Sequence, residues 1–322
     1  MQFAIGIDIG GTNTYFGLVD REGNILLKDV VKTLDFSDPK KMVNAVAEKI
    51  NSSLNRLPQG DAGSQLVGIG IGAPNANYFR GTIENAPNLK WKGVVPLAKY
   101  FSEKLKIPAV LTNDANAAAL GEMYFGGAKG MKDFIFITLG TGLGSGIVAN
   151  GQLVYGHDGF AGELGHTILI QHGRQCGCGR KGCLEQYCSA TGIVITYLDI
   201  LKSEHHNSLN EIEISGVTAK SIYELALKGD EAALNAFNFT GEWLGFALAN
   251  SVAYTSPEAI FLFGGLAEAG ELLFNPTRIS FEKNLLNNYK GKVKIQPSLL
   301  PQNDAAILGA ASLIWNEIPN KN

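Results

Sequence analysis

Short apolar runs separated by glycine or polar turns make up the beginning of the chain. FAIGIDI (3–9) and YFGLVD (15–20) flank the turn GGTNT, and the turn REGN leads into a third run, ILLKDVVKT (25–33). Apolar runs of this length around tight turns predict antiparallel strands. Beyond them, helical periodicity predicts a helix near residues 39–57, and LVGIGIGAP (66–74) predicts a buried strand.

The middle of the chain repeats this opening pattern. Residues 134–155 again contain a strand-like run, a glycine turn, a second run and another turn. The glycines correspond in order, with Gly10, Gly17 and Gly23 in the first copy and counterparts near Gly140, Gly146 and Gly151 in the second. Chance similarity between two glycine-turn hairpins is the alternative explanation. The repetition favours two related domains that face each other across a cleft.

The rest of the pattern alternates helices and strands. PAVLTNDANAAALGEMYF passes from a strand (109–112) into a helix (115–125), and long helical stretches occupy residues 221–254. AIFLF (259–263) predicts a strand, and residues 305–317 predict a last helix.

The length of the chain favours two domains, because 322 residues exceed the size at which a single core keeps growing. We expect a first α/β domain over residues 1–118, onto which the C-terminal segment 303–322 packs back. The larger second domain is expected over residues 119–302, where it contains a metal-binding loop and the oligomer interface.

Composition and charge exclude several functional classes. The residues are 45% hydrophobic, and a formal net charge of -3 offers no electrostatic basis for binding nucleic acid or an anionic membrane. The N-terminus lacks the features of a signal peptide, and no run reaches the ~18 apolar residues that a membrane span needs. Four cysteines in a chain of this kind favour reduced thiols or a metal site over disulfides. We therefore expect a cytoplasmic protein without nucleic-acid or membrane partners.

Two glycine-rich loops follow the first strand of each hairpin. The first contains Asp8, Gly10, Gly11, Thr12 and Asn13, and the second, LGTGLGSG (139–146), contains Gly140, Thr141, Gly142 and Gly144. A carboxylate at a strand end beside open backbone N–H groups suits a magnesium–phosphate complex. A plain hairpin turn is the alternative for the first loop, but the closely spaced glycines of the second are costly to order. Neither loop has the Walker or Rossmann pattern, and together they favour a polyphosphate ligand.

Asn113 and Asp114 stand between a predicted strand and a predicted helix. One interpretation is a helix cap, for which Asp is a favoured residue. The other is a carboxylate that takes a proton from a hydroxyl nucleophile, kept ionised by the helix N-terminus. The sequence at this point leaves both open.

Three of the four cysteines, Cys176, Cys178 and Cys183, lie within eight positions, and His166 precedes the first of them by ten. Three thiolates and an imidazole form a closed tetrahedral set that is typical of structural zinc. Thiols without a metal are the alternative, although the glycines between the cysteines allow the chain to wrap around an ion. Cys188 lies outside this spacing and is expected to be a packed thiol.

Two glutamates flank the expected zinc ligands, because Glu163 precedes the histidine by three residues and Glu185 follows Cys183 by two. A metal that folds the loop would hold both carboxylates in place. Paired, fixed carboxylates are good acceptors for adjacent hydroxyl groups, as on a sugar. Glycosidase-type acid–base chemistry is the rival use of such a pair, and the phosphate-type loops argue against it.

These motifs together resemble the ROK family (repressors, uncharacterised open reading frames and sugar kinases), within the actin-like and hexokinase-like ATPase superfamily. The resemblance runs nearly from end to end. The matching stretches are DIGGTN (8–13), ENAPNLKW (84–91), NDANAAALGE (113–122), LGTGLGSG (139–146), AGELGH (161–166), CGCGRKGCLE (176–185) and FGG (263–265).

The resemblance implies an α/β fold of two actin-like, ribonuclease H-like domains with mixed sheets around an interdomain cleft, plus a zinc-stabilised loop. It implies that Mg²⁺ and ATP bind at the two glycine loops, with Gly264 and Gly265 beside the adenosine. The implied sugar contacts are Asn88, Asn113, Asp114, Glu163, His166 and Glu185. Asp114 would be the catalytic base, and His166 would bind Zn²⁺ through one ring nitrogen and the sugar through the other. A homodimer or a dimer of dimers is implied as well.

The activity that the resemblance implies is ATP-dependent phosphorylation of a hexose, with the 6-hydroxyl of glucose as the first expected acceptor. N-acetylmannosamine, N-acetylglucosamine, fructose and allose remain alternatives. One departure from the family pattern is Asn75, which follows Pro74 where other members often have glycine. We expect this departure to alter the edge of the sugar pocket.

Three other classes fit the sequence less well. A sugar-responsive transcriptional regulator would need a helix-turn-helix ahead of the first glycine loop, whereas the first strand is expected to begin at residue 3. A zinc-ribbon nucleic-acid module would need a basic surface. A sugar-binding protein without catalytic activity would have no need for Asp8, Asp114 and both glycine loops.

Overall fold

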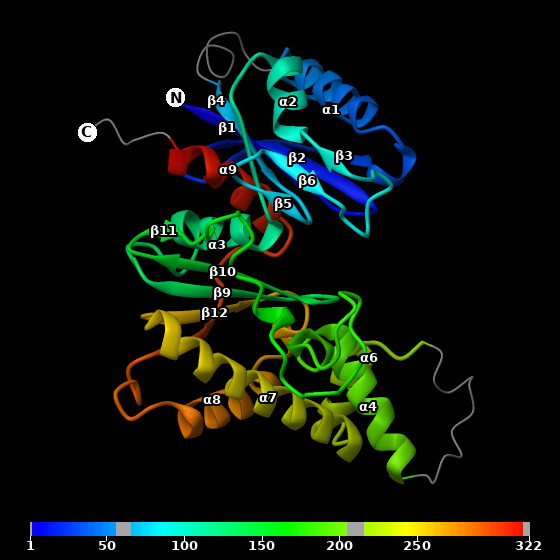
Figure 1. Ribbon diagram of the computed structural model, residues 1–322, viewed down its shortest axis with the longest axis vertical. Coiled ribbons are helices and arrows are strands. Elements are labelled where there is room, and N and C mark those ends of the chain that lie inside the picture. Colours follow the sequence, from blue (N-terminus) through cyan, green and yellow to red (C-terminus); the bar gives the residue numbers. More distant parts are fainter. Residues whose placement is uncertain (1, 56–65, 205–215, 318–322) are drawn as a thin grey trace. The chain divides into compact units, whose positions relative to one another are not determined.

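The computed structural model describes residues 2–55, 66–204 and 216–317, and its elements follow the predicted pattern closely (Figure 1). The strands are β1 (Phe3–Ile9), β2 (Asn13–Asp20), β3 (Ile25–Lys32), β4 (Leu66–Gly72), β5 (Ala76–Asn77), β6 (Thr82–Glu84), β7 (Val94–Val95), β8 (Ala109–Thr112), β9 (Phe134–Leu139), β10 (Leu143–Ala149), β11 (Gln152–Leu153), β12 (Ala259–Phe263) and β13 (Lys294–Pro297). The helices are α1 (Pro39–Leu54), α2 (Leu97–Leu105), α3 (Asp114–Phe125), α4 (Ala190–Glu204), α6 (Ala219–Leu227), α7 (Glu231–Thr255), α8 (Glu271–Asn284) and α9 (Ala305–Glu317). The expected helix end at 56–57 and the C-terminal residues 318–322 lie outside the described residues.

Two sheets share one strand order, as the repeated hairpin pattern predicts. Their strand orders are β3-β2-β1-β4-β8 and β11-β10-β9-β12-β13. In each sheet the hairpin strands pair antiparallel, β1 with β2 and β9 with β10. The next strand in the order pairs parallel with the hairpin, β4 with β1 and β12 with β9. A small separate sheet has the order β5-β6-β7.

The chain divides into two units. The first contains Met1–Met131, Leu153–Ala161 and Leu299–Asn322, and the second contains Lys132–Gln152 and Gly162–Ser298. Helix α3 belongs to the first unit because it packs against α9. The division therefore falls after Met131, whereas the sequence pattern indicates a boundary near residue 118.

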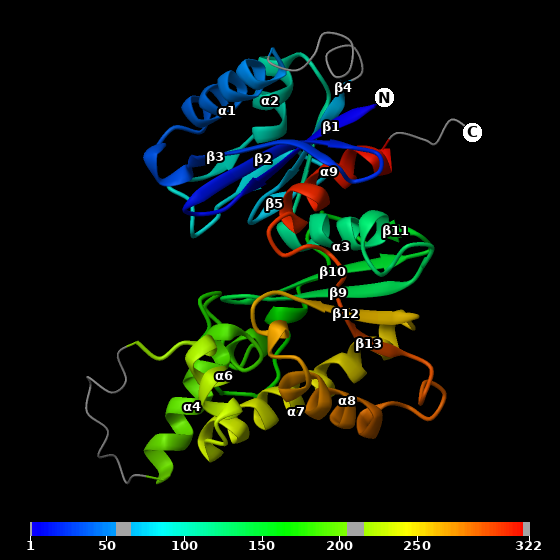
Figure 2. The same ribbon diagram turned by 180° about the vertical axis from the view of Figure 1, so that it is seen from behind.

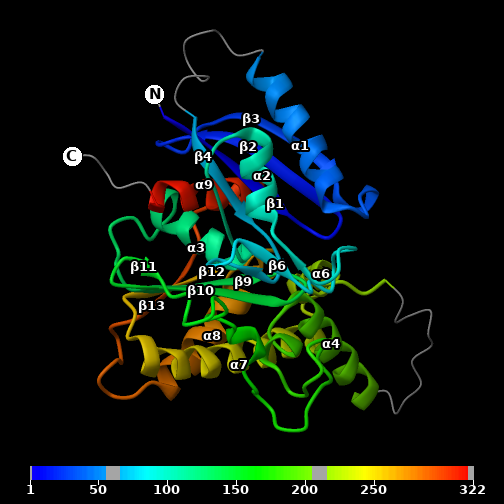
Figure 3. The same cartoon turned by 45° about the horizontal axis from the view of Figure 1, so that its top comes forward.

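In the first unit, helices cover both faces of the sheet. Figures 2 and 3 show α1 and α2 on one face and α9 on the other. Helix α9 approaches the strands unusually closely, since a Cβ at Gly6 would collide with the carbonyl oxygen of Ile307. A Cβ at Gly70 would collide in the same way with the carbonyl oxygen of Ala310. These two glycines let the helix backbone lie directly on the sheet.

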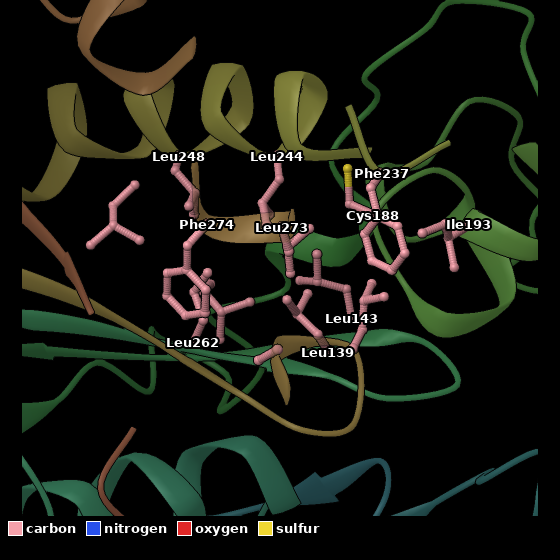
Figure 4. Packing of buried hydrophobic residues seen from close by; sticks show 14 of the residues in the cluster. Leu139, Leu143, Cys188, Ile193, Phe237, Leu244, Leu248, Leu262, Leu273 and Phe274 are labelled. Atoms are coloured by element: carbon pink, nitrogen blue, oxygen red, sulfur yellow. The ribbon is translucent and has the colours of Figure 1, made fainter. Parts of the chain in front are cut away.

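In the second unit, α7 and α8 pack on one another, and a continuous core lies between them and the sheet. Figure 4 shows Leu244 of α7 and Phe274 of α8 in this core, together with Leu262 of β12 and Leu139 of β9. Cys188 is fully buried in the same cluster, so the prediction of a packed thiol is confirmed. The core thereby anchors the turn after β9 and the chain segment that leads into α4.

None of the described helices could span a membrane. Within the three described stretches of the chain, every helix is too short or insufficiently apolar to cross a lipid bilayer.

Candidate functional site

The predicted zinc ligands lie together in the second unit. The ligand atoms of His166, Cys176, Cys178 and Cys183 are all within 4.8 Å of one another. The Sγ atoms of Cys178 and Cys183 are 3.6 Å apart, and Cys176 Sγ lies 3.7 Å from His166 Nδ1. A tetrahedral zinc with Zn–S bonds of about 2.3 Å needs sulfur–sulfur separations of about 3.8 Å. The donor set and its spacing therefore fit a structural Zn²⁺.

Glycines shape the loop around these ligands. The amide of Cys176 donates to the carbonyl of Arg180, at 2.9 Å, which closes a turn around the ligand set. Gly179 and Gly182 have φ values of +89° and +83°, which favour glycine. A side chain at Gly182 would also collide with the carbonyl of Ile170. The glycines between the cysteines thus allow the chain to fold back within a few residues.

Glu163, His166 and Glu185 lie together beside the ligand set. His166 Nδ1 is 3.7 Å from Glu185 Oε1, and its Nε2 is 4.0 Å from Glu163 Oε2. Cys176 Sγ lies 2.9 Å from the same Glu185 oxygen. Nδ1 therefore faces the thiol of Cys176, and Nε2 faces the carboxylate of Glu163. The Glu163 side chain is 55% exposed and that of Glu185 17%, so Glu185 is much the more firmly enclosed.

The second glycine loop is joined to these glutamates. Ser145 Oγ donates to the carbonyl of Gly162 and accepts from the amide of Leu164, the latter at 3.1 Å. A Cβ at Gly142 would lie 2.6 Å from Glu185 Oε2. Gly142 therefore leaves room for a carboxylate, a role that its position in a phosphate-type loop did not reveal. Residues 139–146, 161–166 and 176–185 form one connected set of loops.

In the first unit, Asp8 and Asp114 lie near the ends of β1 and β8, the two strands on either side of β4. Asp8 is in β1 opposite Gly72 of β4, and β8 ends just before Asp114. A Cβ at Gly72 would contact Asp8 Oδ1 at 3.8 Å and Asp114 Cα at 3.7 Å. The sheet register thus brings two carboxylates together around one glycine.

Asn113, rather than Asp114, is the N-cap of α3. Its Oδ1 accepts from the amide of Ala115 at 2.8 Å, and Asp114 is the first helical residue. The Asp114 carboxylate accepts from the same amide, also at 2.8 Å. Because the capping function is already filled by Asn113, Asp114 is not needed as the cap.

Burial changes the acidity of both carboxyl groups. The pKa of Asp8 rises to about 7, mainly through burial and secondarily through the charge of Asp114. Burial also raises the pKa of Asp114, although hydrogen bonds from the helix backbone act to lower it. The helix N-terminus does act in the expected direction on the pKa of Asp114, but desolvation of the carboxylate is the larger effect. With a pKa of about 7, the Asp8 carboxyl group is only partly ionised at neutral pH.

The remaining first-unit candidates form the turn after β1. The amide of Gly10 donates to the carbonyl of Asn13 at 2.9 Å. A Cβ at Gly11 would lie 2.8 Å from the carbonyl oxygen of Asn88. The turn DIGGTN therefore packs against the loop that holds the predicted sugar contact Asn88.

Asn75 has a left-handed backbone, with φ +50°. This conformation favours glycine, and asparagine is among the few other residues that tolerate it. Its Nδ2 donates to the carbonyl of Glu84 at 3.2 Å. Asn75 thus adopts a backbone conformation that glycine could also adopt, and it adds a side chain.

A cavity of about 470 Å³ lies next to Gly265 in the second unit. Lys220 and Tyr223 of α6, Phe237 of α7 and Glu268 line it together with that glycine. Gly264 has φ +96°, and a Cβ there would lie 2.8 Å from the carbonyl oxygen of Leu139. The sequence indicated the two glycines but none of the side chains, because they come from separate helices without a shared motif.

Known proteins resemble this chain over nearly its full length. The sequence profile of the ROK family matches residues 4–317. A glucokinase from Streptomyces coelicolor is 36% identical over 320 residues, which cover 97% of this chain and 98% of that protein. A crystal structure of a ROK family glucokinase from Streptomyces griseus, in complex with glucose and AMPPNP, has a TM-score of 0.78 and 34% identity, covering 97% of this chain and 98% of that one. A xylose repressor from Bacillus spizizenii is 31% identical, covering 97% of this chain and 77% of the repressor. These matches confirm the expected fold class.

Proposed function

This chain belongs to the ROK family, and from that membership we propose that it is an ATP-dependent glucokinase, which transfers a phosphoryl group to the 6-hydroxyl of glucose. The observation that carries the proposal lies in the second unit. There the Cys3His cluster, Glu163, Glu185 and a glycine-rich loop are joined by direct contacts. A sugar-holding carboxylate packed against a phosphate-type loop suits phosphoryl transfer, which depends on the mutual positioning of the two substrates.

We assign ATP to the glycine loops and the cavity. Backbone N–H groups of residues 10–13 and 139–146 would bind the phosphates, and Asp8 would position Mg²⁺. The cavity beside Gly265 would take the nucleoside, with Tyr223 and Phe237 as its aromatic lining. Aromatic and apolar walls with a few polar groups are usual for such ligands.

We assign the sugar to the residues around the zinc ligands and to Asp114. Glu163, Glu185 and His166 Nε2 would bind hydroxyl groups, and Asn88 and Asn113 would add polar contacts. Asp114 would accept the proton of the 6-hydroxyl, and burial, which raises its pKa, makes the carboxylate a stronger base than an exposed one. Zinc, when bound, orients the imidazole and leaves Nε2 to interact with the sugar.

The proposal is tested by ADP release with a panel of hexoses at saturating Mg²⁺-ATP. We expect the highest kcat/KM with glucose, compared with N-acetylmannosamine, N-acetylglucosamine, fructose and allose. A clear preference for another sugar would contradict the assignment of glucose. Absence of sugar-dependent ADP release with every hexose would contradict a kinase.

The acidity of Asp8 predicts a pH-dependent affinity for the metal–nucleotide complex. Mg²⁺ binds the ionised carboxylate, while the pKa of about 7 leaves Asp8 largely protonated below neutrality. The affinity for Mg²⁺-AMPPNP should therefore rise as the pH increases through about 7, with a proton released on binding below that pH. Calorimetry in two buffers of different ionisation enthalpy measures this release. Equal proton release in Asp8→Asn would assign the effect to another group.

Assembly and location are further parts of the proposal. A homodimer or a dimer of dimers follows from the family resemblance, and sedimentation analysis measures it. The cytoplasm is the compartment that would supply both ATP and reduced thiols for the zinc cluster.

A further inference from the structure

Arg174 precedes the cysteines of the metal-ligand set and makes several side-chain contacts, although it is not itself a potential metal ligand. Its Nη1 lies 2.8 Å from the carbonyl oxygen of Gln186, 3.2 Å from that of Gly192 and 3.0 Å from Thr196 Oγ1. Its Nη2 forms an ion pair with Asp199 at 2.9 Å. The guanidinium group therefore ties the loop to the first turns of α4.

Tyr187 holds Arg174 from the other side. The guanidinium carbon lies 4.7 Å from the centre of the Tyr187 ring, and the Arg174 amide donates to the Tyr187 hydroxyl at 2.8 Å. A side chain at Gly173 would collide with that hydroxyl. Stacking on an aromatic ring together with several directed hydrogen bonds is a use that lysine cannot reproduce.

Glu185 stands between two fixed points. On its N-terminal side, Cys183 belongs to the Cys3His set that fits Zn²⁺; on its C-terminal side, Gln186 is held by Arg174. The Glu185 carbonyl is also held, because it accepts from Ser189 Oγ at 2.6 Å. The metal constrains only one end of this turn, so the direction of the Glu185 side chain depends on the other end as well.

We propose that Arg174 is a positioning residue for Glu185, which sets the affinity for the sugar independently of the metal. The inference rests on the proposed binding of sugar hydroxyls by Glu185. In this proposal Arg174 holds the C-terminal end of the turn at residues 183–186, and metal-bound Cys183 holds its N-terminal end. The arginine touches neither the metal ligands' donor atoms nor the nucleotide cavity among the contacts described, so its effect should be confined to the sugar.

The test is Arg174→Lys, which keeps the positive charge and removes the planar guanidinium group with its several N–H donors. We expect the KM for glucose to rise about 10-fold, as for other residues that orient a ligand-binding group, while the KM for ATP and the zinc content stay unchanged. Hydrogen exchange should accelerate at the amides of Gln186 and Tyr187, which are bonded within this turn. Arg278→Lys is the matched control, because Arg278 also stacks on a ring, that of Phe274, and pairs with a carboxylate outside the loop.

A double-mutant comparison separates positioning from a general structural role. If Arg174 acts through Glu185, then Arg174→Lys should add little to the KM effect of Glu185→Gln. Full additivity, loss of zinc, or an unchanged KM for glucose in Arg174→Lys would each overturn the proposal. If the wild-type protein phosphorylates no hexose, the proposed function fails. Hydrogen exchange at the amides of Gln186 and Tyr187 then still tests whether Arg174 anchors the turn. Unchanged protection of Gln186 and Tyr187 would then overturn its role as an anchor.

Discussion

Replacing Asp114 by asparagine should lower kcat with glucose by at least about 100-fold, the lower end of what a general base contributes. Asparagine keeps the shape of the side chain and an oxygen that can accept from the Ala115 amide, but it cannot take the proton of the 6-hydroxyl. The cap of α3 belongs to Asn113 and stays intact. Steady-state kinetics and a calorimetric titration with glucose measure the two expected outcomes, a loss of turnover and retained sugar binding.

The matched control is Asp38→Asn. Asp38 caps α1, where its side chain accepts from the amide of Lys40 at 2.8 Å. Asparagine caps helices as well as aspartate does, so this variant should keep both stability and activity. Near-normal turnover of Asp114→Asn would remove that residue from the role of base. A loss of glucose binding together with turnover would make it a binding residue instead.

Loss of the metal should be the second large effect. Cys178 is the exposed ligand of the set, so Cys178→Ser removes one zinc ligand with little change in packing. We expect the zinc content to fall from one equivalent and the KM for glucose to rise by about 10- to 100-fold, because Glu163, His166 and Glu185 lose their common support. Most of the second-unit core is formed by the sheet and helices α4, α6, α7 and α8, so circular dichroism should show a folded chain after chelation. Elemental analysis and kinetics on the same samples provide the measurement.

Cys188→Ala is the control for this experiment. Cys188 is the fourth cysteine, and it is buried in the second-unit core with its Sγ 3.5 Å from the carbonyl of Thr240. Its replacement removes a thiol without touching the ligand set, so the zinc content should stay at one equivalent. An active wild-type protein that contains no zinc would contradict the role given to the cluster.

The sequence predicted those parts of the site whose residues are close together along the chain. The spacing of Cys176, Cys178 and Cys183 specifies a ligand set, because three thiols in one short loop can reach a common ion. Strand ends could be located in the same way, since one apolar run ends next to Asp8 and another ends shortly before Asp114. The two similar hairpins predicted two related units, and the two sheets do share one strand order, whereas the fold class came from the family resemblance.

Contacts between distant segments could not be predicted. Gly142 and Glu185 are far apart in sequence, and only the folded chain shows that a methyl group at one would displace the other. Arg174 lies two residues before Cys176, but several of its partners are on α4, among them Gly192 and Thr196. The balance of burial against backbone hydrogen bonds at Asp114 also depends on packing. Local sequence patterns indicate which chemical groups are present, whereas tertiary contacts determine the pKa values and the orientations of these side chains.

The close packing of α9 on the N-terminal sheet bears on the order in which the protein is made. The ribosome completes β1, β4 and β8 long before it reaches residues 305–317, so the face that α9 covers stays open during most of translation. All secondary structure of the second unit, by contrast, is available once β13 has left the exit tunnel. The half of the protein that is synthesised first is therefore the last to become complete, and a nascent chain that stops short of α9 presents an apolar sheet to chaperones.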